Sequence, residues 1–154
     1  MAETAPARDL AQRKQDTLRL LEQEVDAWIA TADSERGMPY LVPLSFLWEG
    51  ETLLIATFAN SPTGRNLRSS GQVRLGLGGT RDVVLIEGTA EAIETTAIPP
   101  VLGDAFAAKT GFDPRQSTSP FLYFRVTPRR IQAWREENEL ANRELMRNGQ
   151  WIVS

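Results

Sequence analysis

Short apolar runs separated by polar turns constrain the fold of this chain more than any other feature. The first two runs flank a polar turn at 34–37, where Gly37 can adopt a positive φ, and together they predict a hairpin over 26–48. Further strands are expected at 51–59, 72–79, 83–94 and 120–134. Short strands joined in hairpins, with few helices between them, indicate a mainly β fold: a six-stranded antiparallel barrel with peripheral helices.

Helical patterns flank and interrupt this series of strands. Leucines recur on one side of segment 9–24, so we expect a helix there, preceded by a frayed, flexible N-terminus at residues 1–8. Segment 96–110 is expected to form a helix or an irregular crossover interrupted by a Pro-Pro pair. The alternating charges of segment 136–148 predict a final solvated helix.

Two residues inside predicted strands disturb the regular pattern. Pro43 removes a hydrogen-bond donor from its strand, which marks either a sheet edge or a bulge. Alternatively, the backbone there does not pair with a neighbouring strand, which leaves Val42, Leu44 and Ser45 free to contact a flat ligand. Gly88, at the middle of the fifth strand, predicts a bulge or a close backbone approach.

Composition excludes several kinds of chemistry. The chain has no cysteine and no histidine, which removes disulfides, thiol nucleophiles, His-based triads and most zinc or haem ligation. No sequence pattern resembles a metal cage, a phosphate-binding Walker loop or a nucleophile elbow. Any redox chemistry must therefore come from a bound cofactor.

Size and charge are those of an ordinary folded domain. The chain has 154 residues, of which 42% are hydrophobic, and we expect residues 9–154 to form one domain. A net charge of −3 gives no general attraction to nucleic acid or to an anionic membrane. The chain shows no membrane-spanning apolar segment and no signal-peptide pattern, so a cytoplasmic location is expected.

Several hydroxyl-bearing residues and two arginines lie between residues 57 and 70, where the predicted third strand ends and a short helix begins. The Ser-Pro pair at 61–62 is a helix-start signal and Gly71 is a stop signal, so a capped surface helix accounts for the pattern. The same residues could hold a phosphate, because a helix N-terminus presents unpaired N–H groups and a partial positive charge. Thr63 adds a hydroxyl, and Arg65 and Arg68 can share one side of the helix. The residue pattern leaves both interpretations open.

Three stretches of the chain, in this order and spacing, resemble the split β-barrel flavin- and deazaflavin-binding proteins of the pyridoxamine 5′-phosphate oxidase-like family. They are IATADSERGMPYLVPLSFLWEGETLLIAT, RNLRSSGQVRLGLGG and VVLIEGTAE. The resemblance implies a homodimer whose flavin or deazaflavin ring lies between the subunits, with the cofactor phosphate at the turn after the third strand. Carried over residue by residue, it places Thr57, Ser61, Thr63, Arg65 and Asn66 around the phosphate, and Val42, Pro43 and Leu44 along the ring.

The same resemblance implies an oxidoreductase that uses FMN or the deazaflavin coenzyme F-420 to transfer a hydride to or from a small organic substrate. No catalytic side chain of the protein is required for that transfer. A non-catalytic cofactor-binding protein and a purely structural barrel dimer are the alternatives. Many deazaflavin-binding relatives have a lysine where this chain has Thr63, so Arg65, Arg68 or a partner-chain arginine would have to supply the positive charge. The sequence reveals no second phosphate site of the kind that pyridoxamine phosphate needs.

Overall fold

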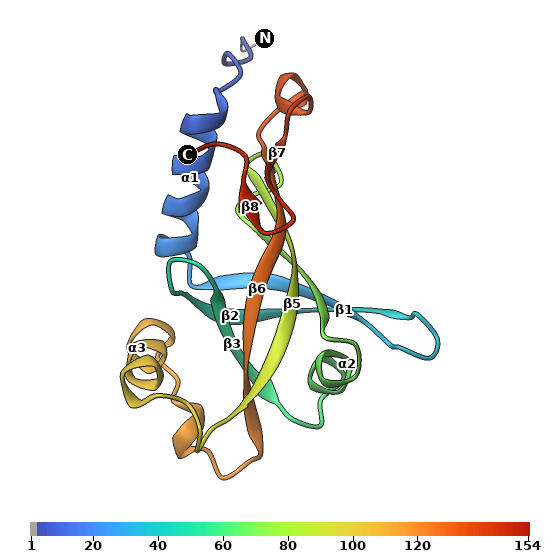
Figure 1. The fold of residues 1–154 in the computed structure, drawn as a ribbon, viewed down its shortest axis with the longest axis vertical. Helices are drawn as coiled ribbons and strands as arrows, with labels where there is room; N and C mark the ends of the chain where they lie inside the picture. Colours follow the sequence, from blue (N-terminus) through green and yellow to red (C-terminus); the bar gives the residue numbers. More distant parts are fainter. Residues whose placement is uncertain (1–2) are drawn as a thin grey trace.

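Strand β6 (Phe121–Trp134) organises the sheet because it is long enough to pair with three other strands. One edge of β6 pairs with β5 (Val83–Glu94). Its other edge pairs first with β3 (Leu53–Phe58) and then with β7 (Glu144–Arg147). The β3–β6 pairing closes a barrel in the order β3-β2-β1-β4-β5-β6, with every pairing antiparallel (Figure 1). The predicted six-stranded antiparallel barrel is confirmed.

The computed structural model describes residues 3–154, and Met1 and Ala2 lie outside the described residues. The remaining strands are β1 (Asp26–Ala32), β2 (Pro39–Trp48), β4 (Gln72–Leu77) and β8 (Gln150–Trp151). The helices are α1 (Leu10–Gln23), α2 (Pro62–Ser70) and α3 (Pro100–Thr110), with 3-10 turns η1 (Pro114–Gln116) and η2 (Glu137–Glu139). No helix within residues 3–154 is both long enough and apolar enough to cross a membrane.

Two apolar cores meet at β3. Leu53 and Ile55 point into the barrel, whereas Leu54 points to the opposite face, as alternation along a strand requires. That outer face is covered by α3, where Phe106 packs edge-on against Tyr123 with ring centroids 5.5 Å apart. Figure 1 shows α3 and α2 on opposite sides of the lower half of the molecule, with strands β3, β5 and β6 between them.

Gly88 marks a bulge, as predicted. The pairing of β5 with β6 shifts in register there, so that Glu87 lies opposite Arg130 and Gly88 opposite Pro128. A Cβ atom at Gly88 would lie 2.8 Å from a backbone carbonyl oxygen of β6, closer than real Cβ atoms approach. The extra residue on β6 is Arg129, which is exposed.

Arg8 is held in place before α1 begins. Its guanidinium donates to the Glu139 carboxylate at 2.7 Å and to the Asp16 carboxylate at 3.0 Å. All three side chains are between 3% and 10% exposed, and the Arg8 backbone N–H also donates to Glu139 at 2.8 Å. The predicted frayed segment 1–8 therefore does not extend through Arg8. A buried ion pair between residues so distant in sequence leaves no periodic signal by which it could be predicted.

The prediction of a final helix over 136–148 is wrong. After η2 the chain forms the hairpin β7–β8, and β7 extends the sheet beyond β6. Asn148 and Gly149 have φ values of 52° and 76°, the positive values that a two-residue hairpin turn requires. Leu145 and Met146 are buried against the barrel core. The Asn-Gly turn and this burial outweigh the alternating charges that favoured a helix.

Candidate functional site

Strand β2 has one edge that is only partly paired. It pairs with β1 from Pro39 to Ser45, but with β3 only from Phe46 to Trp48. Within residues 3–154 no strand covers the remaining edge of 39–45. The site is built on this open edge.

The hydrogen-bond alternation identifies which residues face the open edge. The Glu49 N–H donates to Thr52 on the β3 side, and successive residues of a strand alternate between its edges. Leu41, Pro43 and Ser45 therefore direct their backbone groups away from β1. Pro43 costs no ladder hydrogen bond in this position, which agrees with the edge interpretation. The Pro43 carbonyl and the N–H and C=O groups of Leu41 and Ser45 remain available to a ligand.

A cavity of about 400 Å³ lies beside this edge. This volume falls in the range of small-molecule sites, roughly 300–1,000 Å³. One wall is the open edge itself, and the opposite wall is formed by aromatic residues of α3, the loop that follows it and β6. The lining residues are Asp26, Pro43, Leu44, Ser45, Ala56, Phe106, Thr110, Phe112 and Phe121. The cavity is therefore largely apolar, with backbone polar groups along one side.

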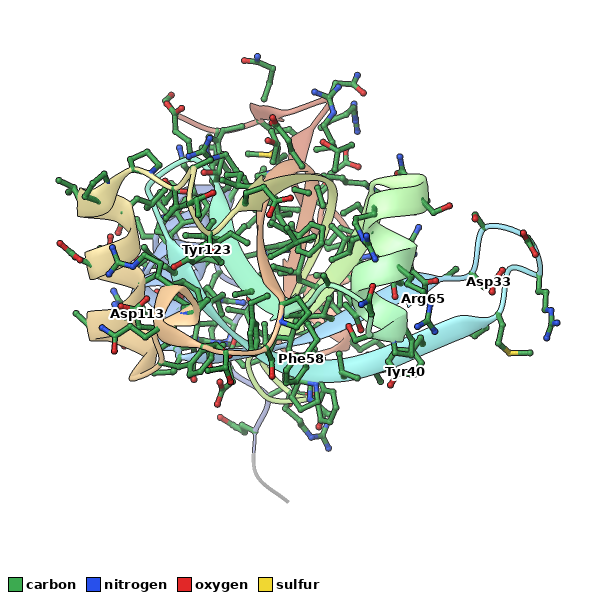
Figure 2. The ribbon with its side chains drawn as sticks, turned by 90° about the horizontal axis from the view of Figure 1, so that it is seen from below. Asp33, Tyr40, Phe58, Arg65, Asp113 and Tyr123 are labelled. Carbon is green, nitrogen blue, oxygen red and sulfur yellow. The ribbon has the colours of Figure 1, made fainter. Side chains whose placement is uncertain are left out.

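Phe58 connects this cavity to the start of α2. Its ring lies 4.3 Å from that of Phe121, which lines the cavity, and Phe58 is the last residue of β3. Figure 2 shows Phe58, Tyr40 and Arg65 following one another from the side of α3 to the side of α2. Phe58 is 50% exposed and Tyr40 39%. A ligand that fills the cavity can reach the first turn of α2 across these two rings.

Ser61 caps α2 as predicted. Its Oγ accepts a hydrogen bond from the Gly64 N–H at 3.0 Å and donates to the Phe58 carbonyl at 2.8 Å. The Thr57 Oγ1 lies 3.3 Å from the Ser61 Oγ, so the structure brings these two predicted site residues together. The first helical turn also lies tightly against the end of β3, because a Cβ at Gly64 would be 2.3 Å from the Phe58 carbonyl oxygen.

Two guanidinium groups gather over the turn that Ser61 caps. Arg65 donates to the Asn60 carbonyl, and Arg68 donates to the Ala59 carbonyl and, at 3.4 Å, to the Asn60 side chain. Each guanidinium has five N–H donors and uses only some of them here. Both side chains are exposed and add to the partial positive charge of the helix N-terminus. This turn is an electrostatically favourable place for an anion.

Two other residues predicted to contact the phosphate, Thr63 and Asn66, do not lie on the exposed side of this turn with the arginines. Thr63 is 2% exposed and shares the buried side of α2 with Leu67, so it does not accompany the two arginines on the solvent side. The Asn66 side chain donates to the Thr31 Oγ1 at 3.1 Å and ties α2 to β1. Arg68, which the sequence offered as an alternative source of positive charge, lies with Arg65 over this turn, whereas Thr63 does not.

Of the three residues predicted to lie along the cofactor ring, two line the cavity and one does not. Pro43 and Leu44 line the cavity, whereas Val42 does not line it; both Val42 and Leu44 pack against the barrel core. Tyr40 and Phe58 are the residues that the sequence analysis missed. The available signals were the position of Tyr40 two residues before Val42 on one strand face, and the position of Phe58 at the end of a buried strand.

Three ionisable groups near α3 have displaced pKa values, and each shift has a structural cause. A hydrogen bond from Arg115 lowers the pKa of Asp113, and burial raises the pKa of Tyr123 (both labelled in Figure 2). Burial lowers the pKa of Lys109, whose ammonium lies 4.2 Å from the centre of the Phe46 ring. Within residues 3–154 no group of three acidic side chains is arranged to hold a metal ion.

Comparisons with known proteins agree with the barrel. A family model described as pyridoxamine 5′-phosphate oxidase matches residues 14–135. A search of curated proteins found no match. A solved structure from Listeria innocua, provisionally assigned as a pyridoxamine 5′-phosphate oxidase, has a TM-score of 0.64 at 19% identity and covers 80% of this chain and 98% of its own.

Two further solved structures are of proteins whose names mention a flavin or deazaflavin cofactor. An F420 reductase has a TM-score of 0.60 at 17% identity, covering 73% of this chain and 93% of its own. A FAD-binding protein from Mesorhizobium loti has a TM-score of 0.58 at 18% identity, covering 77% of this chain and 89% of its own. At these identities the likeness establishes the shared fold.

Proposed function

Because the chain belongs to the pyridoxamine 5′-phosphate oxidase family, we propose that it is a flavin-dependent oxidoreductase that binds FMN or the deazaflavin coenzyme F-420 along the open edge of β2. The cofactor would transfer a hydride to or from a small organic substrate. One observation carries the proposal: an open strand edge, an apolar cavity and a cationic helix start lie next to one another. Structural neighbours named as an F420 reductase and as a FAD-binding protein support the choice of cofactor class.

The residues present fit such a cofactor. A tricyclic ring has apolar faces and a polar rim, and the cavity offers Phe106, Phe112 and Phe121 to the faces. The backbone groups of Pro43 and Ser45 would hydrogen-bond the rim. Arg65 and Arg68 would hold the phosphate beside the Ser61 cap, replacing the charge that Thr63 does not carry. Thr57 would hold this turn in place through its contact with Ser61, and Asn66 through its hydrogen bond to Thr31.

The bound cofactor supplies the hydride chemistry, and the protein binds and orients it and excludes water. The aromatic wall keeps the cavity apolar, which limits access of water to the reacting ring. Asp26 fixes one wall by accepting a hydrogen bond from the Ser45 hydroxyl at 2.6 Å. This contact holds the side chain of Ser45 while its backbone groups face the ligand.

A homodimer forms part of this proposal. Trp28 lies opposite Pro43 on β2 and Gly76 on β4, and Gly76 lies opposite Leu85, so these residues share the outer sheet face. Trp28 is 54% exposed and Leu85 40%, and an exposed apolar patch of this kind is typical of an interface. Pro43 borders both the patch and the cavity, so a second copy on the patch would close one side of the cofactor site. A cytoplasmic location also stays a proposal.

Titration of the purified chain with FMN and with F-420, followed by absorbance and thermal unfolding, tests the proposal. We expect one cofactor to bind and raise the unfolding temperature. The double variant Arg65→Gln with Arg68→Gln should bind it at least about tenfold more weakly, since charge-assisted hydrogen bonds contribute roughly 1.5–3 kcal/mol each. Arg36→Gln, which removes one positive charge from an exposed position on the β1–β2 turn, is the control. Absence of binding by both cofactors would overturn the proposal.

A non-catalytic carrier is the second candidate, and the burial of Thr63 favours it. The phosphate would then be held without the lysine of many deazaflavin-binding relatives, by the exposed Arg65 and Arg68. The assay is reduction of quinones, enones and nitro compounds by the loaded protein with a supplied electron donor. Bound cofactor without turnover of any of these substrates would select the carrier.

A further inference from the structure

A second hollow lies on the outer sheet face, away from the β2 edge. It has a volume of about 430 Å³ and forms where β4, β5 and β6 meet the β7–β8 turn. Its lining is dominated by arginines from three strands, Arg74 on β4, Arg129 and Arg130 on β6, and Arg147 on β7. The other lining residues are Gln72, Val73, Glu87, Gly88 and Asn148.

Positive charge exceeds negative charge in this cleft. Glu87 accepts from Arg74 at 2.8 Å and from Arg130 at 3.3 Å, while Glu144 pairs with Arg130 at 2.7 Å and with Arg147. Among residues 3–154, Arg129 has no carboxylate partner within ion-pair distance. Four guanidinium groups against two carboxylates leave two positive charges uncompensated, in a chain whose net charge is −3.

The two signs are also separated by depth. The side chains of Arg74 and Arg147 are 73% and 68% exposed, whereas those of Glu87 and Glu144 are 28% and 17% exposed. The carboxylates thus lie beneath the guanidinium groups and are already hydrogen-bonded by them. An incoming anion meets N–H donors before it meets a carboxylate.

Arg129 is positioned by two features of the backbone. The bulge opposite Gly88 makes it the extra residue of β6, so it projects beside Arg130 instead of alternating with it. Its carbonyl accepts from the Gly149 N–H at 2.8 Å, and a Cβ at Gly149 would lie 3.1 Å from the Arg129 Nη1. The guanidinium therefore rests against the β7–β8 turn, which limits the freedom it would lose on binding a ligand.

We infer that this cleft binds a small organic phosphate monoester. Guanidinium groups hold a phosphate dianion through paired N–H donors, and two uncompensated charges match its charge. The volume admits a small phosphorylated molecule. The cleft shares no residue with the proposed cofactor site, and its Arg74–Glu87 pair borders the proposed dimer patch, since it lies two residues along from Gly76 and Leu85 on the same face.

Calorimetric titration of the full chain with phenyl phosphate and with inorganic phosphate tests this inference. We expect the variant Arg129→Gln with Arg147→Gln to bind phenyl phosphate at least about tenfold more weakly than the unchanged protein. Arg36→Gln should bind it within about twofold, because that residue lies outside the cleft. Arg129→Lys keeps the charge but loses the paired donors, and should give an intermediate loss.

Each alternative outcome has a distinct meaning. Absence of phenyl phosphate binding, or equal weakening by Arg36→Gln, overturns the site. Inorganic phosphate binding as tightly as phenyl phosphate overturns the organic ligand. FMN also carries a phosphate monoester, so the Arg129→Gln, Arg147→Gln variant is titrated with FMN as well. Unchanged FMN affinity alongside lost phenyl phosphate binding supports a separate site, while parallel loss of both contradicts it.

Discussion

Replacing Glu139 with glutamine should destabilise the protein in a pH-dependent way. Hydrogen bonds donated by Arg8 are the main reason why the pKa of Glu139 falls from its ordinary 4.5 to about 2. The Glu139 side chain is only 3% exposed, so solvent screens this interaction weakly. At about 1.4 kcal/mol per pKa unit, the lowered pKa corresponds to roughly 3 kcal/mol of unfolding free energy at neutral pH.

The sign of the pH dependence follows from the lowered pKa. The stabilisation is complete above the unfolded-state value of 4.5 and is lost as the pH falls towards the folded-state value of about 2. Glu139→Gln removes the charge at every pH. The unfolding free energies of the two proteins should therefore differ most near pH 7 and converge at acidic pH. Part of the difference persists there, because Arg8 is left buried beside an uncharged group.

Urea unfolding followed by tryptophan fluorescence, at several values between about pH 7 and pH 2.5, measures this difference. Glu137→Gln is the matched control, because Glu137 belongs to the same 3-10 turn and is exposed. It should shift the unfolding free energy by no more than about 0.5 kcal/mol. A difference between Glu139→Gln and the unchanged protein that stays constant across the whole pH range would refute the reasoning.

Three further changes test the local structure. Gly64→Ala places a Cβ 2.3 Å from the Phe58 carbonyl oxygen, so we expect a loss of roughly 2 kcal/mol in urea unfolding together with weaker cofactor binding. Gly149→Ala places a side chain on a residue whose φ is 76°, so we expect a loss of about 1 kcal/mol in unfolding free energy. Thermal unfolding would show this as a decrease of about 2–4 °C in the unfolding temperature. Ser61→Asp keeps an acceptor for the Gly64 N–H, so stability should change by less than about 1 kcal/mol. The added negative charge should nevertheless lower cofactor affinity by about tenfold or more in an absorbance titration, and unchanged affinity would leave Ser61 as a helix cap alone.

Features decided by neighbouring residues could be predicted from the sequence. The Ser61 cap and the Gly71 stop of α2, whose φ is 67°, depend on a few adjacent residues. Gly88 was predicted to mark a bulge or a close backbone approach because glycine is uncommon inside a strand, and the structure has both. The β1–β2 hairpin likewise follows from apolar runs on either side of a polar turn.

Features decided by distant residues could not be predicted in this way. The C-terminal hairpin has a local signal in the Asn-Gly turn at 148–149, but the burial of Leu145 and Met146 against the barrel core, which favours a strand over a helix, depends on distant residues. Arg8 is ordered by a carboxylate on η2, far away in sequence. The cavity combines the edge of β2 with Phe112 and Phe121, and only the closed barrel brings these elements together. The burial of Thr63 depends on which side of α2 meets the barrel.

A crystal structure of the chain with its bound cofactor tests the central claim most directly. The account predicts a tricyclic ring in the cavity between Pro43 and Phe121, hydrogen-bonded to the open edge of β2. It also predicts a phosphate within hydrogen-bond distance of Arg65 and Arg68. A cofactor bound elsewhere on the molecule, with the cavity filled by its own phenylalanine side chains, would contradict the account.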